Sequence, residues 1–221
     1  MDRNRYRGII DLSVEDVLKL WEKEWTDYSS VQESGSIVGK WLHSQRMNII
    51  RKMLKLIPKE ASTIDIGCGG GETLSLLRVS GFKNSIGIDL SPSAIKKSEK
   101  HGFIKNKDVF VMDGSKTPYP DRNFVFVFSE GLWEHFKNPI PFIDEACRIS
   151  DKYLMVVQPD HFSFFGGLVH WGWEKFSKKG VLEYSFTMQF FIDNVARNGL
   201  KLVAKKSTYL NEQCVMLFWR D

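Results

Sequence analysis

Two amphipathic helices are predicted at the start of the chain. The first spans about 13–28 and the second about 37–57, where Pro58 ends it. Ser13 and Asp16 resemble a capping box at the start of the first helix. The apolar positions of the first helix, which recur at helical spacing, are Val14, Val17, Leu18, Trp21 and Trp25.

Short apolar and β-branched runs then alternate with helical segments. Strands are predicted over 62–68, 85–90, 108–113, 124–129, 153–158, 200–210 and 213–220. Helices are predicted over 72–79, 92–100, 140–149 and 188–197.

This alternation is typical of an α/β fold in which helices cover both faces of a mostly parallel sheet. The first, fourth and fifth runs are continuously apolar, as strands buried on both faces are. The last two runs are joined by a tight turn at Asn211 and Glu212. We therefore expect these two strands to be antiparallel to each other.

Length and composition exclude several classes. A chain of 221 residues predicts one domain with an appendage. A net charge of +4 is too small to indicate a nucleic-acid partner, and no apolar run is long enough for stable membrane insertion. Cys68, Cys147 and Cys214 form no CxxC motif. They favour a reducing, cytoplasmic location and indicate no zinc site.

The strongest local pattern is a glycine-rich turn between the first predicted strand and its helix. Gly67, Gly69 and Gly71 would allow backbone conformations forbidden to other residues and a close approach by a ligand. Asp89 ends the second strand, where a carboxylate can accept both hydroxyls of a ribose. Asp113 ends the third strand and can accept from the amine of an adenine.

The turn does not fit the GxGxxG fingerprint of dinucleotide-binding proteins. The third glycine of that motif would fall on Glu72 or Leu74, depending on the register. A carboxylate at position 72 would also repel a pyrophosphate. This spacing disfavours NAD and favours a ligand without phosphate.

These motifs resemble those of the class I S-adenosylmethionine-dependent methyltransferases, in particular the small-molecule, methyltransferase type 11-like group. TIDIGCGGGETL resembles the glycine motif, GIDLSPSAI the ribose motif, and VMDGSKTPYPDRNFVFVF the region of the third and fourth strands. Phe126 departs from the family pattern, which usually has an aspartate there. The resemblance implies a Rossmann-like seven-stranded sheet, mostly parallel with an antiparallel last strand and helices on both faces.

The resemblance also implies the cofactor, S-adenosyl-L-methionine, and the residues around it. Those expected to line its methionine portion are Asp65, Gly67, Gly69 and Gly71. The ribose and the adenine would be held by Asp89, Leu90, Asp113 and Gly114. Ser129 would lie beside the methionine and the transferring methyl group.

Catalytic candidates follow the fourth strand in SEGLWEHF. His135 has the pKa range of a general base, and Glu134 with His135 resembles a pair frequent in the family. Alternatively, the two residues only organise the loop. Glu130 could join them as a metal ligand, but its spacing differs from the related pattern, and no metal is predicted.

The predicted reaction is transfer of a methyl group to an O, N or C atom of a small aromatic or apolar acceptor. The alternatives are an NAD-dependent oxidoreductase and a non-catalytic S-adenosylmethionine-binding protein. Residues 1–58 are expected to form a helical cap on the cofactor-binding domain, 59–221. An insertion at about 160–186 contains aromatic residues from Phe162 to Phe176, which would line the acceptor pocket opposite the tryptophans of the cap. Alternatively, these aromatic residues form a membrane-contact or partner surface.

Overall fold

The computed structural model of the chain describes residues 13–27, 37–164, 166–168 and 183–221. Two parts of the predicted cap, 1–12 and 28–36, lie outside these residues. Most of the predicted acceptor insertion, 165 and 169–182, also lies outside them.

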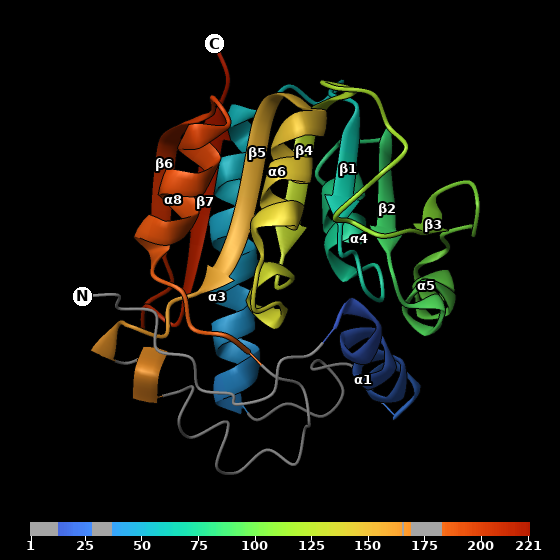
Figure 1. Ribbon diagram of the computed structural model, residues 1–221, viewed down its shortest axis with the longest axis horizontal. Helices are drawn as coiled ribbons and strands as arrows, with labels where there is room; N and C mark the ends of the chain where they lie inside the picture. Colours follow the sequence, from blue (N-terminus) through green and yellow to red (C-terminus); the bar gives the residue numbers. More distant parts are fainter. Residues whose placement is uncertain (1–12, 28–36, 165, 169–182) are drawn as a thin grey trace.

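A seven-stranded sheet forms the centre of the fold (Figure 1). Its strand order is β3-β2-β1-β4-β5-β7-β6. The first five strands pair in parallel, and β7 is antiparallel to both β5 and β6. This confirms the predicted fold class. The strands are β1 Thr63–Ile66, β2 Ser85–Asp89, β3 Val109–Val111, β4 Phe124–Glu130, β5 Ser150–Pro159, β6 Lys201–Ser207 and β7 Gln213–Trp219.

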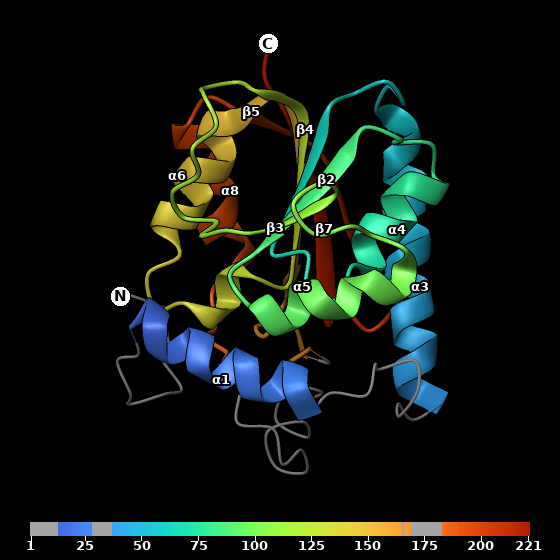
Figure 2. The same ribbon diagram turned by 90° about the vertical axis from the view of Figure 1, so that its right-hand side faces the viewer.

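Helices cover both faces of the sheet (Figures 1 and 2). α3, α4 and α5 pack on one face and α6 and α8 on the other, while α1 crosses the edge where the parallel strands end. The α-helices are α1 Val14–Asp27, α3 Ile37–Met53, α4 Glu72–Val79, α5 Pro92–Ser98, α6 Ile140–Ile149 and α8 Met188–Arg197. Short 3-10 helices are η1 Leu54–Leu56, η2 Glu99–His101 and η3 Trp133–His135.

Each face of the sheet has its own hydrophobic core. Successive residues of a strand point to opposite faces. Ile64 and Ile66 of β1 therefore pack with α6 and α8, while Phe126 and Phe128 of β4 pack with α3 and α4. All four side chains are fully buried. The continuous apolar runs thus belong to strands covered on both faces, as predicted. Phe126 fills this core where the family usually has an aspartate.

The second predicted helix is regular only as far as Met53. The remaining turn, η1, is a 3-10 helix, and Ile57 takes an extended conformation with ψ 133°. A residue that precedes proline is sterically disfavoured in the α-helical region, and Pro58 follows here. In the described part of the chain, no helix is long and apolar enough to cross a membrane.

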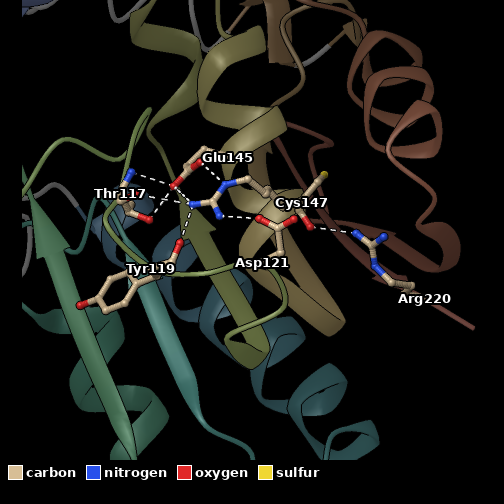
Figure 3. Close-up of polar contacts among 7 residues, drawn as sticks. Thr117, Tyr119, Asp121, Glu145, Cys147 and Arg220 are labelled. Carbon is tan, nitrogen blue, oxygen red and sulfur yellow. Dashed lines mark hydrogen bonds and ion pairs between the residues drawn. The ribbon is translucent and has the colours of Figure 1, made fainter.

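An ion pair between buried Glu145 and half-buried Arg148 fixes the loop between β3 and β4 to α6 (Figure 3). Glu145 Oε1 accepts hydrogen bonds from the Thr117 amide at 2.7 Å and from Arg148 Nη2 at 2.8 Å. Arg148 also donates to the Tyr119 carbonyl at 2.8 Å and to Asp121 at 2.7 Å. Burial alone would raise the pKa of Glu145, but the hydrogen bonds from Arg148 and Thr117 outweigh it and lower the pKa.

We expect Glu145→Gln to lower the free energy of unfolding by about 2 kcal/mol at neutral pH, since it removes charged hydrogen bonds from a buried site. The pKa of Glu145 is lowered in the folded state, so its stabilisation is present above the ordinary pKa of 4.5. The difference between wild type and variant should therefore shrink as the pH falls below that value. Urea unfolding at several pH values measures it. Exposed Glu99→Gln is the control, and equal stability of the two variants would contradict the assignment.

Candidate functional site

The glycine-rich turn after β1 has the backbone geometry that the sequence predicts. Gly67, Gly69 and Gly71 have φ values of 76°, 50° and 86°, in the left-handed region that disfavours other residues. The amides of Gly67 and Cys68 both donate to the Ile88 carbonyl of β2, at 2.8 and 3.0 Å. The turn is thereby held at the end of two adjacent strands.

Close approach of α1 also requires glycine in this turn. A Cβ atom on Gly69 would lie 2.7 Å from the ring of Trp25. Trp25 packs against Gly69 and Gly70, and Lys97 Nζ lies 5.5 Å from the centre of the Trp25 ring. The first helix therefore contacts the turn directly.

A pocket lies between α1 and the strand ends. Of the predicted cofactor residues, those that line it are Gly67, Gly69, Asp89, Leu90 and Gly114. Its opposite wall comes from α1 and includes Trp21 and Trp25. His135 also lines the pocket. The structure therefore brings together residues that the sequence predicts for ribose, adenine and acceptor.

Asp89 is held in place by the glycine turn. Its Oδ2 accepts from the Gly69 amide at 2.9 Å and its Oδ1 from the Ser91 amide at 2.8 Å. Burial raises the pKa of Asp89 to about 6, with the charge of Glu22 acting in the same direction and the two amides against it. The carboxylate is thus fixed at the pocket wall with capacity for further hydrogen-bond donors.

The other predicted cofactor residues do not line the pocket. Asp113 is half-buried and accepts from the amide and hydroxyl of Ser115, at 2.8 and 2.7 Å, next to the pocket residue Gly114. Ser129 is fully buried and donates to the Ile66 carbonyl at 3.0 Å. Gly71 ends the turn as the N-cap of α4.

Asp65 lies beneath the turn as a buried acid. Its side chain is 1% exposed, and its Oδ2 has no hydrogen-bond partner among the described residues. Burial raises the pKa of Asp65 well above its ordinary value, and the charges of Glu130 and Asp89 add to this effect. A buried carboxylate without a cation is costly, so this position favours a positively charged ligand.

Glu22 holds α1 over the pocket. Its two carboxylate oxygens accept from the hydroxyls of Ser91 and Ser93, both at 2.6 Å. Burial would raise the pKa of Glu22, but these hydrogen bonds outweigh it and lower the pKa. Ser91 also caps α5 by accepting from the Ala94 amide at 3.0 Å. Ser91 thereby joins α1 to the start of α5, two residues after Asp89.

The two catalytic candidates occupy different environments. His135 faces the pocket and packs edge-on against Trp21, with ring centres 4.8 Å apart. Glu134 is 4% exposed and does not line the pocket. Burial, followed by the charge of Glu183, raises the pKa of Glu134 to about 8.

Glu130 at the end of β4 binds residues from two helices. Arg46 Nε of α3 lies 2.6 Å from its Oε1, and Thr73 Oγ1 of α4 donates to its Oε2 at 2.9 Å. Arg46 also lies 3.0 Å from His43 Nδ1. Within the ranges that the structure describes, no three His, Cys, Asp or Glu side chains are grouped so that they could hold a metal ion.

Two acids near the site, Glu22 and Glu183, were not predicted from the sequence. One feature of the sequence could have indicated Glu22, namely its position next to Trp21 on a helix expected to close over the pocket. Glu183 had no local signal, because it precedes α8 and reaches Glu134 only through the fold.

Comparison with known proteins identifies the domain. The sequence model of a family described as "Methyltransferase domain" matches residues 64–152. EEF1A lysine methyltransferase 2 from Mus musculus is 43% identical over 143 residues, which cover 62% of this chain and 55% of that protein. The Homo sapiens protein of the same name is 42% identical over 94 residues, 40% of this chain and 39% of that protein. The chain thus matches about half or less of each relative's length.

Solved structures share the fold. A methyltransferase from Thermotoga maritima has a TM-score of 0.65 at 19% identity and covers 92% of this chain and 99% of its own. Magnesium protoporphyrin IX methyltransferase from Synechocystis PCC 6803 was solved with bound S-adenosylhomocysteine. Its TM-score is 0.64 at 15% identity, and the match covers 92% of this chain and 94% of that protein. At these identities the likeness concerns the fold.

The predicted small-molecule acceptor is wrong. It rested on aromatic residues after β5, and the sequence relatives are instead named for a lysine of EEF1A. Of those aromatics, the two with described side chains are exposed, Phe162 by 45% and Phe164 by 81%, so they do not enclose a small apolar molecule.

The spacing of the glycine turn disfavours a dinucleotide, and residues 64–152 match a methyltransferase domain within a fold that is shared with solved S-adenosylmethionine-dependent methyltransferases.

Proposed function

We propose that this chain transfers the methyl group of S-adenosylmethionine to the side-chain nitrogen of a lysine in a protein. The observation that carries the proposal is its 43% identity over 143 residues with a protein named for EEF1A lysine methylation. The buried acids near the end of β4 support it, because an amine acceptor enters as a cation. These acids would not stabilise the binding of an apolar acceptor.

The chain's residues fit the cofactor. It would supply a methyl group on a sulfonium, whose transfer depends mainly on positioning. The glycine turn leaves room that a Cβ would fill, and Asp65 offers an oxygen without a partner among the described residues to a cationic group. Asp89 would accept the ribose hydroxyls, and Leu90 would flank the adenine.

The remaining predicted residues have supporting parts in this proposal. Asp113 orders the turn that carries Gly114 to the pocket and would fix the adenine edge. Ser129 of β4 donates a hydrogen bond to the Ile66 carbonyl of β1 and would position the methionine portion of the cofactor. Gly71 lets α4 begin directly after the turn.

We propose that His135 and Glu134 act on the acceptor lysine. His135 lines the pocket and would face the methyl group, while Glu134 lies behind the wall and would act on the charge of the acceptor.

Residues 1–58 would act as a cap, supported by the contacts of α1, and 160–186 as the acceptor insertion. A cytoplasmic location is supported by Cys68, Cys147 and Cys214, which are free and buried.

Incubation with methyl-labelled S-adenosylmethionine and purified EEF1A should label the protein on lysine. Mass spectrometry of its peptides would locate the methyl groups. A parallel reaction with a protein-free metabolite extract should give no labelled product. Label confined to the metabolite fraction would contradict the proposal, and cofactor binding without any product would support the non-catalytic alternative.

Asp89→Asn should weaken S-adenosylhomocysteine binding about tenfold or more, because the ribose loses a charged acceptor. Wild-type affinity should also fall as the pH is lowered through about 6, where Asp89 takes up a proton. The variant should lack this dependence. Calorimetric titration at several pH values measures both effects, with exposed Asp193→Asn as the control. A variant that keeps wild-type affinity would exclude the ribose role.

Glu22→Gln should speed dissociation of S-adenosylhomocysteine by about fivefold to tenfold, because α1 loses its charged contacts with Ser91 and Ser93. Stopped-flow tryptophan fluorescence measures the rate, since Trp21 and Trp25 line the pocket. The control is Glu15→Gln on the exposed side of the same helix. Equal dissociation rates for both variants would show that α1 does not retain the cofactor.

A further inference from the structure

Exposed apolar side chains gather at the edge of the sheet where the parallel strands end. They come from the start of α3, from the segment after β5 and from the turn between β6 and β7. Exposed apolar residues that occur singly are ordinary, but a cluster of them indicates a binding surface. The six, here called the aromatic patch, are between 45% and 88% exposed and are Ile37, Trp41, Phe162, Phe164, Leu168 and Tyr209.

Hydrogen bonds and a ring contact join the three segments. The Tyr209 amide donates to Gln45 Oε1 of α3 at 3.0 Å, and the rings of Tyr209 and Trp41 meet edge-on with centres 6.0 Å apart. On the other side of the turn, Ser163 Oγ donates to the Asn211 carbonyl at 2.8 Å. The aromatic patch is therefore one surface built from segments that are far apart in the sequence.

The turn between β6 and β7 is well ordered, although Tyr209 is 79% exposed. Thr208 is 2% exposed, and its hydroxyl donates to the Glu212 carboxylate. The Glu212 carbonyl accepts from the Asp160 amide at 3.0 Å. A backbone that is already fixed loses little freedom on binding, and Tyr and Trp side chains contribute much of the energy of protein interfaces. The turn thus presents an aromatic side chain ready for a partner.

The aromatic patch continues from the wall of the pocket. η3, whose last residue lines the pocket, is joined to the segment before α8, because the Glu134 carbonyl accepts from the Tyr184 amide at 2.6 Å. In that segment, Ser185 Oγ lies 3.0 Å from Nδ1 of His161, the residue before Phe162. A molecule bound at the pocket on this side would therefore meet the patch next.

We infer that the aromatic patch is the docking surface for the folded acceptor protein whose lysine enters the pocket. This inference rests on the proposed function and adds the surface that recognises its substrate. A specific protein interface covers roughly 800 Å² on each partner, far more than the mouth of a pocket. The acceptor protein must therefore contact neighbouring surface at this edge, and it would place exposed apolar side chains close to its lysine.

The charges beside the aromatic patch favour a protein with a basic surface over the other occupants. Residues 159–168 and 207–213 contain no Lys or Arg, and the start of α3 adds only Lys40. Asp160 and Glu183 are partly exposed next to these segments. An anionic membrane would require several basic residues around the apolar ones. A partner surface that carries the acceptor lysine is instead complementary to these acids.

Steady-state methylation of EEF1A tests the inference in the full chain. The double variant Phe164→Ser/Tyr209→Ser should raise the KM for EEF1A about tenfold or more, because both side chains are buried only in the complex. The value of kcat, the affinity for S-adenosylhomocysteine and the unfolding temperature should not change. The KM for a short peptide around the methylated lysine should also be unchanged, since a peptide does not reach the patch.

The matched control is Val79→Ser, because Val79 is 80% exposed and ends α4 away from the glycine turn where that helix begins. It should keep the wild-type KM for EEF1A. A double variant that also keeps the wild-type KM would overturn the inference while the proposed function stands.

Binding can be measured without turnover. Calorimetric titration of EEF1A into the chain saturated with S-adenosylhomocysteine should give an affinity that falls about tenfold or more in the double variant. Such a loss of binding without any methylation by the wild type would reject the proposed reaction but keep the docking surface. Equal affinities, or no binding to the wild type, would overturn the inference.

The two other occupants are tested on the chain alone. Sedimentation should show a monomeric wild-type protein that does not associate with vesicles of phosphatidylserine and phosphatidylcholine. A dimer that the double variant abolishes would overturn the inference in favour of a second copy of the chain. Vesicle binding that the double variant abolishes would overturn it in favour of a membrane.

Discussion

Parallel pairing of β1 with both β2 and β4 is the constraint on which the site depends. It brings the ends of three strands to one edge of the sheet, so residues far apart in sequence lie around one pocket. The glycine turn can then hydrogen-bond to Ile88 and to Asp89 in the next strand. α1 packs on this edge only because Gly69 lacks a side chain. The pocket and the position of α1 over it both follow from that pairing.

The fold was well predicted from the sequence, because strands buried on both faces appear as continuous runs of apolar residues. β1 and β4 are such strands, and their predicted positions agree with the structure to within two residues, while β5 begins three residues earlier than predicted. That Gly67, Gly69 and Asp89 would lie together at one edge of the sheet was predictable too, since all three follow or end strands, and they line one pocket. Contacts between distant segments, such as Glu22 with Ser91, leave no comparable pattern.

The acceptor was mispredicted for a physical reason. Aromatic residues after β5 were interpreted as a pocket lining, but composition does not reveal exposure, and Phe164 lies at the surface. For the proposed lysine acceptor, the signal to look for is charge. Glu134 has an ordinary place in the sequence, and its altered pKa arises from burial and from Glu183, both of which depend on tertiary packing. Local patterns therefore identify the cofactor more readily than the acceptor.

α1 connects the two halves of the site. Trp25 rests on the glycine turn, and one turn away Trp21 packs against His135 on the acceptor side, while Glu22 between them fixes the helix to α5. In the proposed function, Trp25 would lie on the cofactor side and Trp21 on the acceptor side, and both belong to one helix. A displacement of α1 that admits the cofactor would therefore also separate Trp21 from His135. Such a connection between the two sides of the proposed site would run through this helix and would not need a path through the sheet.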